Sequence, residues 1–195
     1  MKFQELNNVI EFLKNAERLK DTLRSGYTSK GRKESVADHT WRLCLFAITI
    51  HNLYFPDLDI AKLLKICIIH DLGEALNGDI PAPQQNENES KSAMEEKDFK
   101  KIIEPLSKKL KDELFDLWNE YETASSKEAK LAKALDKLET LIQHNQGKNP
   151  SNFDYNFNLS YGSKYTSYTE PIAILRQIID EETSMNLKKQ NANKH

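Results

Sequence analysis

Hydrophobic residues recur at intervals of three and four positions along most of the chain, which is the spacing of one helix face. The segments with this pattern cover residues 5–23, 36–53, 60–76, 91–103, 106–121, 126–146 and 171–183. Only six glycines and six prolines interrupt 195 residues. We therefore predict an all-α fold, in which 60–76 lies at the centre because its middle is apolar nearly all round.

Three stretches lack this periodicity. Residues 25–35 contain two glycines with serines and charged residues, and are predicted to form a loop. Residues 77–90 form a second predicted loop, polar and with two prolines. The stretch 148–168 is rich in Asn, Ser and Tyr and receives no assignment.

Two short patterns predict where helices begin. Ser35, followed three residues later by Asp38, is an acidic variant of the capping box. Asp59 stands directly before the apolar run that starts at Ile60, where an N-cap residue is expected. We therefore expect helices to start at about residues 36 and 60.

The length favours one domain with a substantial core. We predict a single domain over residues 1–183. Its core covers about 5–147, and the helix at about 171–183 follows. The polar residues 184–195 are expected to form a disordered tail.

Composition excludes several classes of protein. Twenty-eight basic and 30 acidic residues give a net charge of −2, without the basic excess of proteins that bind nucleic acid polymers. No apolar run is long enough to cross a bilayer, and the first residues lack a secretory signal pattern. Both cysteines lie in apolar runs, as expected of reduced thiols. We expect a cytoplasmic protein with neither a membrane nor a nucleic acid partner.

The first candidate for chemistry is a polar group at the end of the most apolar segment. His70 and Asp71 directly follow the run ICII, and Glu74 lies on the same edge of the predicted helix. A buried carboxylate must be paired, protonated or bound to a cation. Acids near a helix C-terminus are also opposed by the helix dipole. A bound cation would offset both costs; the alternative is that these acids cap a helix end or pair with a lysine.

Two more residues extend this set. His39 shares a helix face with Leu43 and Phe46, and Asp136 flanks the apolar stripe of the segment 126–146. The alternatives are a hydrogen-bonded core histidine and a solvated acid. With His70 and Asp71, they would supply two imidazoles and two carboxylates. This set suits Mn²⁺, Co²⁺, Fe²⁺ or Zn²⁺, and Mg²⁺ with less ease.

These residues lie in a specific set of motifs. The stretches are LRSGY, ESVADHTWR, IIHDLGEALNGDIPAP, LWNEYETASSKEAKLAKALDKLE and LIQH. Together they resemble the HD-domain superfamily of metal-dependent phosphohydrolases, and within it the 5′-deoxynucleotidase branch. The resemblance covers about residues 5–147. It implies a compact multi-helix bundle with a metal site between helices.

The resemblance also implies roles for individual residues. His39, His70, Asp71 and Asp136 match the four metal ligands. Glu74 and Asp79 match an acidic pair beside the metal, and Arg24 matches the arginine that contacts the substrate phosphate. Tyr27 departs from the pattern, because tryptophan is common at that position. The family further implies a homodimer.

The function that the resemblance implies is hydrolysis of (deoxy)ribonucleoside 5′-monophosphates to nucleoside and phosphate. Glu74 would orient or deprotonate the attacking water. Asp79 would bind the sugar, assist the leaving group or hold a second ion. Arg24 would grip two phosphate oxygens, although an arginine at a helix end is more often simply solvated. The alternative functions are an HD-type phosphodiesterase, a nucleotide-polyphosphate (alarmone) hydrolase, and a non-catalytic protein that binds metal or nucleotide.

Overall fold

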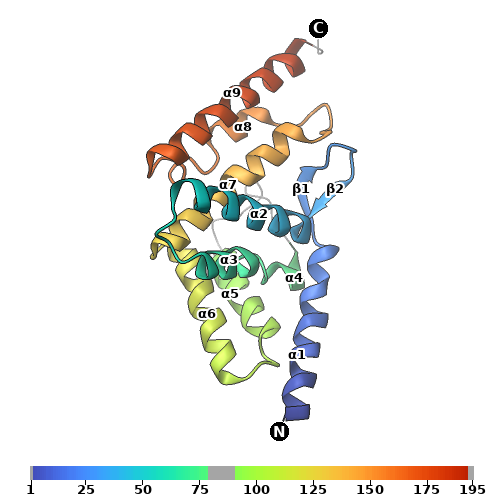
Figure 1. Ribbon diagram of the computed structural model, residues 1–195. Helices are drawn as coiled ribbons and strands as arrows, with labels where there is room; N and C mark the ends of the chain where they lie inside the picture. Colours follow the sequence, from blue (N-terminus) through green and yellow to red (C-terminus); the bar gives the residue numbers. More distant parts are fainter. Residues whose placement is uncertain (1, 79–90, 193–195) are drawn as a thin grey trace.

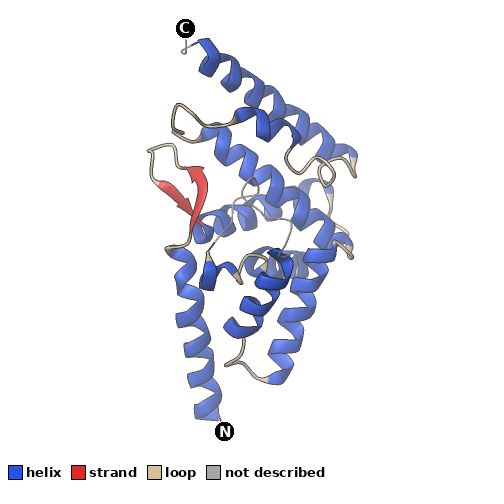
Figure 2. Cartoon of the chain, turned by 180° about the vertical axis from the view of Figure 1, so that it is seen from behind, coloured by secondary structure: helices blue, strands red, loops and turns tan. Residues whose placement is uncertain are grey.

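The computed structural model describes residues 2–78 and 91–192, and within these ranges helices predominate (Figures 1 and 2). The helices are α1 (Lys2–Ala16), the 3₁₀ helix η1 (Glu17–Lys20), α2 (Val36–Tyr54), α3 (Ile60–Ile69), α4 (Glu74–Asn77), α5 (Lys91–Ile102), α6 (Lys108–Thr123), α7 (Lys127–Gln146), α8 (Tyr155–Ser160) and α9 (Glu170–Ala192). The predicted all-α fold class is confirmed, with one small antiparallel hairpin of β1 (Leu23–Tyr27) and β2 (Lys33–Ser35) added to it.

The core forms around α7, which contacts α2, α3, α6, α9 and β1. Its apolar stripe, which includes Leu131, Leu135 and Leu138, is fully buried. Ser126 caps the helix by accepting a hydrogen bond from the Ala129 N–H. In Figure 1, α1 and α9 extend from this core toward opposite ends of the molecule. The centre of the fold is therefore α7 together with α3, whereas the sequence indicated 60–76 alone.

The start of α2 is fixed by the predicted capping box. The Ser35 hydroxyl accepts from the Asp38 N–H, and the Asp38 carboxylate accepts from the Ser35 N–H. Both exchanges satisfy backbone groups that the first turn would otherwise leave unpaired. His39 therefore lies in the first turn of α2, on the face that packs into the core.

The predicted helix over 60–76 is interrupted. Asp59 caps its start as expected, but α3 ends at Ile69, and a tight turn leads to the short helix α4. At Gly73 an added Cβ would lie 2.7 Å from the Glu95 carbonyl oxygen of α5. The close approach of α5 therefore requires glycine in the turn, and the turn carries His70 and Asp71.

The predicted loop over 25–35 is confirmed only for the turn at 28–32, because residues 25–27 and 33–35 belong to the two strands of the hairpin. Thr28 N–H donates to the Arg32 carbonyl, and Gly31 adopts a positive φ of 86° at the turn. The hairpin lies on α7, where the Gln143 side chain donates to the Tyr27 carbonyl. This contact places β1, and with it Arg24, beside the buried helices.

The C-terminal part is more ordered than predicted. Within 148–168, Asp154 caps α8, and Arg176 of α9 donates to the carbonyls of Asn158 and Leu159. The helix α9 continues to Ala192, so the expectation of a disordered tail from residue 184 is wrong up to that residue; residues 193–195 lie outside the described part. Among the described helices, none is long and apolar enough to cross a membrane.

Candidate metal centre

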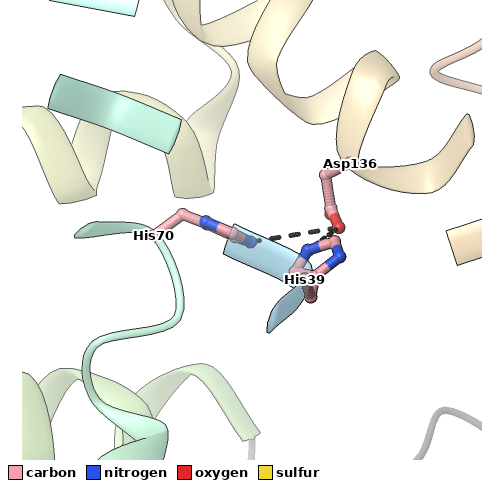
Figure 3. Close-up of side chains that lie close together, drawn as sticks. All are labelled: His39, His70 and Asp136. Atoms are coloured by element: carbon pink, nitrogen blue, oxygen red, sulfur yellow. Dashed lines mark ion pairs between the residues drawn. The ribbon is translucent and has the colours of Figure 1, made fainter. Parts of the chain in front are cut away.

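Four side chains predicted as metal ligands converge between α2, α7 and the turn after α3. His39 Nε2 lies 3.2 Å from Asp136 Oδ1, and His70 Nε2 lies 3.0 Å from Asp71 Oδ2. His39 Nε2 also lies 3.9 Å from Asp71 Oδ2, and His70 Nε2 lies 3.9 Å from Asp136 Oδ1. Figure 3 shows His39, His70 and Asp136 directed toward one another. One donor atom from each of these three lies within 4.8 Å of the others, as ligands of a single ion must.

Both imidazoles are held so that Nε2 faces the cluster. His70 Nδ1 lies 2.8 Å from the Cys67 carbonyl oxygen, which can only accept, so Nδ1 carries the proton. His39 Nδ1 pairs with the Glu139 carboxylate. Neither buried Nε2 makes a hydrogen bond of acceptable geometry with a described residue. An unsatisfied buried polar group costs about 1–3 kcal/mol, and a cation bound by both Nε2 atoms would remove that cost.

Asp136 is buried and held by one of its two oxygens. Its Oδ2 accepts from the Tyr121 hydroxyl at 2.6 Å and pairs with Lys137 Nζ at 2.8 Å, while Oδ1 faces His39. Burial alone would raise the pKa of Asp136, but the charge of Lys137 and the neighbouring His39 hold it well below its ordinary range. The carboxylate is therefore ionised and available to a cation.

Asp71 completes the cluster from the turn after α3. Burial would raise its pKa, but the neighbouring His70, together with the positive charge of Arg24, lowers the pKa below its ordinary range. Asp71 is also the more accessible carboxylate, with a side chain 17% exposed against 4% for Asp136. The open side of the cluster is thus the Asp71 side.

Arg24 reaches this open side from β1. Its Nη1 donates to Asp71 Oδ2 at 3.2 Å, and its Nη2 donates to Thr140 Oγ1 at 3.0 Å. Its Nε lies 3.5 Å from Glu34 Oε2. The alternative of a solvated arginine at a helix end is therefore wrong, because Arg24 lies on a strand and its guanidinium contacts a candidate metal ligand.

The residues that surround the cluster were not predicted as site residues from the sequence. One oxygen of the Glu139 carboxylate pairs with His39 Nδ1, and Arg42 Nε donates to the other oxygen of Glu139. Burial, together with the nearby Glu139, raises the pKa of Glu34 to about 7. Glu34, His39 and Glu139 also lie close enough to hold an ion. Because Arg24 and Arg42 already supply positive charge there, we interpret this second group as support for His39. The sequence signal that could have identified Glu139 is its spacing, since it lies four residues after Leu135 and so on the same buried side of the helix.

The acidic pair predicted beside the metal is only partly described. Glu74 is buried at the first position of α4, and its backbone N–H donates to the Asp71 carbonyl at 3.0 Å. Its backbone is therefore tied to the turn that carries Asp71. Asp79 lies outside the described residues. The roles of both, like those of the four ligands, stay predictions.

The donor set is chemically suited to a divalent ion. Imidazole nitrogen and carboxylate oxygen without thiolate are typical of sites for Mn²⁺, Co²⁺, Fe²⁺ or Zn²⁺. The histidines also have the arrangement found in metal proteins, in which the nitrogen that does not bind the ion is hydrogen-bonded to a carboxylate or a backbone carbonyl. His39 has the first kind of partner and His70 the second.

Comparison with known proteins gives consistent matches. A family model described as "HD domain" matches residues 16–175. The 5′-deoxynucleotidase HDDC2 of Danio rerio is 38% identical over 141 residues, which cover 71% of this chain and 68% of that protein. The protein of the same name from Mus musculus is 31% identical over 180 residues, 91% of this chain and 88% of that protein.

A solved structure supports the fold. It is described as a predicted metal-dependent phosphohydrolase from Magnetospirillum magnetotacticum MS-1, and it superposes with a TM-score of 0.72 over 93% of this chain and 96% of that one. Its identity is 21%, so the likeness concerns the architecture. The resemblance drawn from the motifs is confirmed by the family match and the relatives: the chain belongs to the HD domain family.

Proposed function

We propose that the protein is a metal-dependent phosphomonoesterase that hydrolyses (deoxy)ribonucleoside 5′-monophosphates to nucleoside and phosphate. The observation that carries the proposal is the pair of buried Nε2 atoms that make no hydrogen bond with a described residue and face two ionised carboxylates, with an arginine at the open side. The names of the relatives, 5′-deoxynucleotidases, support the substrate class.

In this proposal His39, His70, Asp71 and Asp136 hold one divalent ion, with Mn²⁺, Co²⁺, Fe²⁺ or Zn²⁺ preferred over Mg²⁺. Such an ion lowers the pKa of water and offsets negative charge on a phosphoryl group. Asp136 and the two histidines contribute from the buried side. Asp71 contributes from the open side, where substrate enters.

The remaining roles fall to residues around the ion. Arg24 binds phosphate oxygens through its planar guanidinium, which suits two parallel hydrogen bonds. Glu74 orients the attacking water or accepts its proton. Asp79 binds the sugar, assists the departing 5′-oxygen or holds a second ion. We further propose that the enzyme is a cytoplasmic homodimer that acts on free nucleotides and binds neither nucleic acid polymers nor membranes.

The decisive experiment is phosphate release by metal-stripped protein to which Mn²⁺, Co²⁺, Zn²⁺ or Mg²⁺ is restored singly. The substrates are dAMP, dTMP, AMP, a cyclic dinucleotide and ppGpp. We expect release from the monophosphates with at least one of the first three ions. Cleavage of only the cyclic dinucleotide or ppGpp would instead establish one of the other hydrolase activities. Metal binding without turnover of any substrate would establish a non-catalytic protein.

A further inference from the structure

We propose that Glu34 and Thr140 are positioning residues that hold the Arg24 guanidinium at the open side of the metal cluster. This proposal rests on the proposed function, in which Arg24 binds the substrate phosphate. Neither residue belongs to the predicted ligand set. Each comes from a different element, Glu34 from β2 and Thr140 from α7.

Thr140 is oriented to accept from Arg24. A hydroxyl has one proton to donate, and the Thr140 hydroxyl donates it to the Asp136 carbonyl of its own helix at 3.1 Å. Its oxygen therefore presents lone pairs to Arg24 Nη2, which lies 3.0 Å away. The same residue thus connects the arginine to the helix turn that carries the metal ligand Asp136.

Glu34 restrains the other end of the guanidinium. Its side chain is buried, and Oε2 lies 3.5 Å from Arg24 Nε. With Asp71 on Nη1 and Thr140 on Nη2, each of the three guanidinium nitrogens has its own partner. Three contacts in different directions define the plane of the group as well as its position. A planar fork must be fixed in both respects to bind two oxygens of one phosphate.

The backbone of Arg24 is held to the same helix as Thr140. Gln143 donates to the Tyr27 carbonyl, and a Cβ added at Gly26 would lie 3.2 Å from Gln143 Cγ. The hairpin therefore packs on α7 one turn from Thr140. Glu34 lies on the paired strand, so that all three residues belong to elements that contact one another.

A structural explanation competes with this one. Glu34 also lies near Glu139 and Arg42, and its carboxylate could serve only to balance charge in that network. Thr140 could serve only to pack the core. These explanations predict that substitutions at both positions act independently of Arg24, whereas positioning residues act through it. A double-mutant cycle separates the two.

Titration calorimetry measures the affinity of the Mn²⁺-loaded protein for inorganic phosphate, and steady-state kinetics give KM and kcat for dAMP. The variants are Thr140→Val, Glu34→Gln, Arg24→Ala and each of the first two combined with the third. We expect Thr140→Val and Glu34→Gln each to weaken phosphate binding and raise KM by about fivefold to tenfold, with less change in kcat. In the Arg24→Ala background, each of these substitutions should change phosphate affinity and KM by no more than about twofold.

Two further variants serve as controls. Thr140→Ser keeps the hydroxyl and should bind phosphate within about twofold of the native protein. Thr183→Val removes a buried hydroxyl of α9 that bonds to Asn145 and Ile179, and should lower thermal stability without altering phosphate binding. Native-like phosphate binding by both Thr140→Val and Glu34→Gln would overturn the proposal. The proposal would also be overturned if the two substitutions lowered phosphate affinity equally with and without Arg24, or if the native protein bound no phosphate. Failure to hydrolyse nucleotides would instead refute the proposed function and leave the phosphate cycle as a separate result.

Discussion

The two sides of the metal cluster differ in how they are held. On the inner side, His39 and Asp136 have side chains 0% and 4% exposed, and each is fixed by a further side chain, Glu139 or Tyr121. On the open side, Asp71 and Arg24 are 17% and 11% exposed and depend on a turn and a hairpin. Under the proposed function, this difference corresponds to a division of roles, in which the inner side retains the ion and the open side binds substrate.

The largest effect should come from removing charge on the inner side. In Asp136→Asn the cluster loses its most enclosed carboxylate, and Lys137 loses its partner. We expect loss of bound metal and phosphate release below about one-thousandth of native. Breaking a buried ion pair should also destabilise the protein by up to about 3–5 kcal/mol. Elemental analysis and urea unfolding measure the two effects. Retained metal with full activity would show that the cluster is not the metal site.

A smaller loss of metal affinity is expected from changing a residue that contacts a predicted ligand but not the ion. Glu139→Gln weakens the partner of His39 Nδ1 without touching the Nε2 atom that faces the cluster. Substitution of such a supporting residue typically lowers metal affinity by about 10–100-fold. Competition with a fluorescent chelator measures this affinity. Glu128→Gln, on the same helix but in contact with Asp59 and Lys62, is the matched control and should leave affinity unchanged.

On the open side the effect should appear in substrate binding. Arg24→Ala removes the guanidinium beside Asp71 but leaves the four ligands in place. We expect KM for a nucleoside monophosphate to rise by about 10–100-fold, because charge-assisted hydrogen bonds to the phosphate are lost. Steady-state kinetics at saturating Mn²⁺ provide the test. Loss of metal with unchanged KM would assign Arg24 to the inner side and remove the division proposed above.

The smallest effect should follow loss of one neutral hydrogen bond. Tyr121→Phe deletes the hydroxyl that donates to Asp136 Oδ2 and leaves Lys137 on the same oxygen. We expect the free energy of unfolding to fall by about 1 kcal/mol and metal affinity to fall by less than tenfold. Urea titration with and without Mn²⁺ measures both. A loss as large as that of Asp136→Asn would mean that Tyr121, not Lys137, chiefly orients the carboxylate.

The sequence by itself determined the features that depend on neighbouring residues. Ser35 with Asp38 fixed the start of α2, and Asp59 fixed the start of α3, because a cap acts within one turn of helix. The four residues could be named as candidate ligands because they lie in or beside apolar runs, but spacing alone left a solvated acid or a core histidine open, and the motif resemblance supplied the set. Their convergence, however, was an expectation that spacing could not supply.

Tertiary structure decided what depends on residues far apart in the chain. The loop predicted at 25–35 is a hairpin because α7 supplies its docking contacts, and α3 ends at Ile69 where α5 packs against Gly73. His39 and Glu139 are 100 residues apart, and Arg24 and Thr140 are 116 apart. Local periodicity carries no information on such pairs, because a helix pattern defines which face is buried but not which side chain from another element meets it.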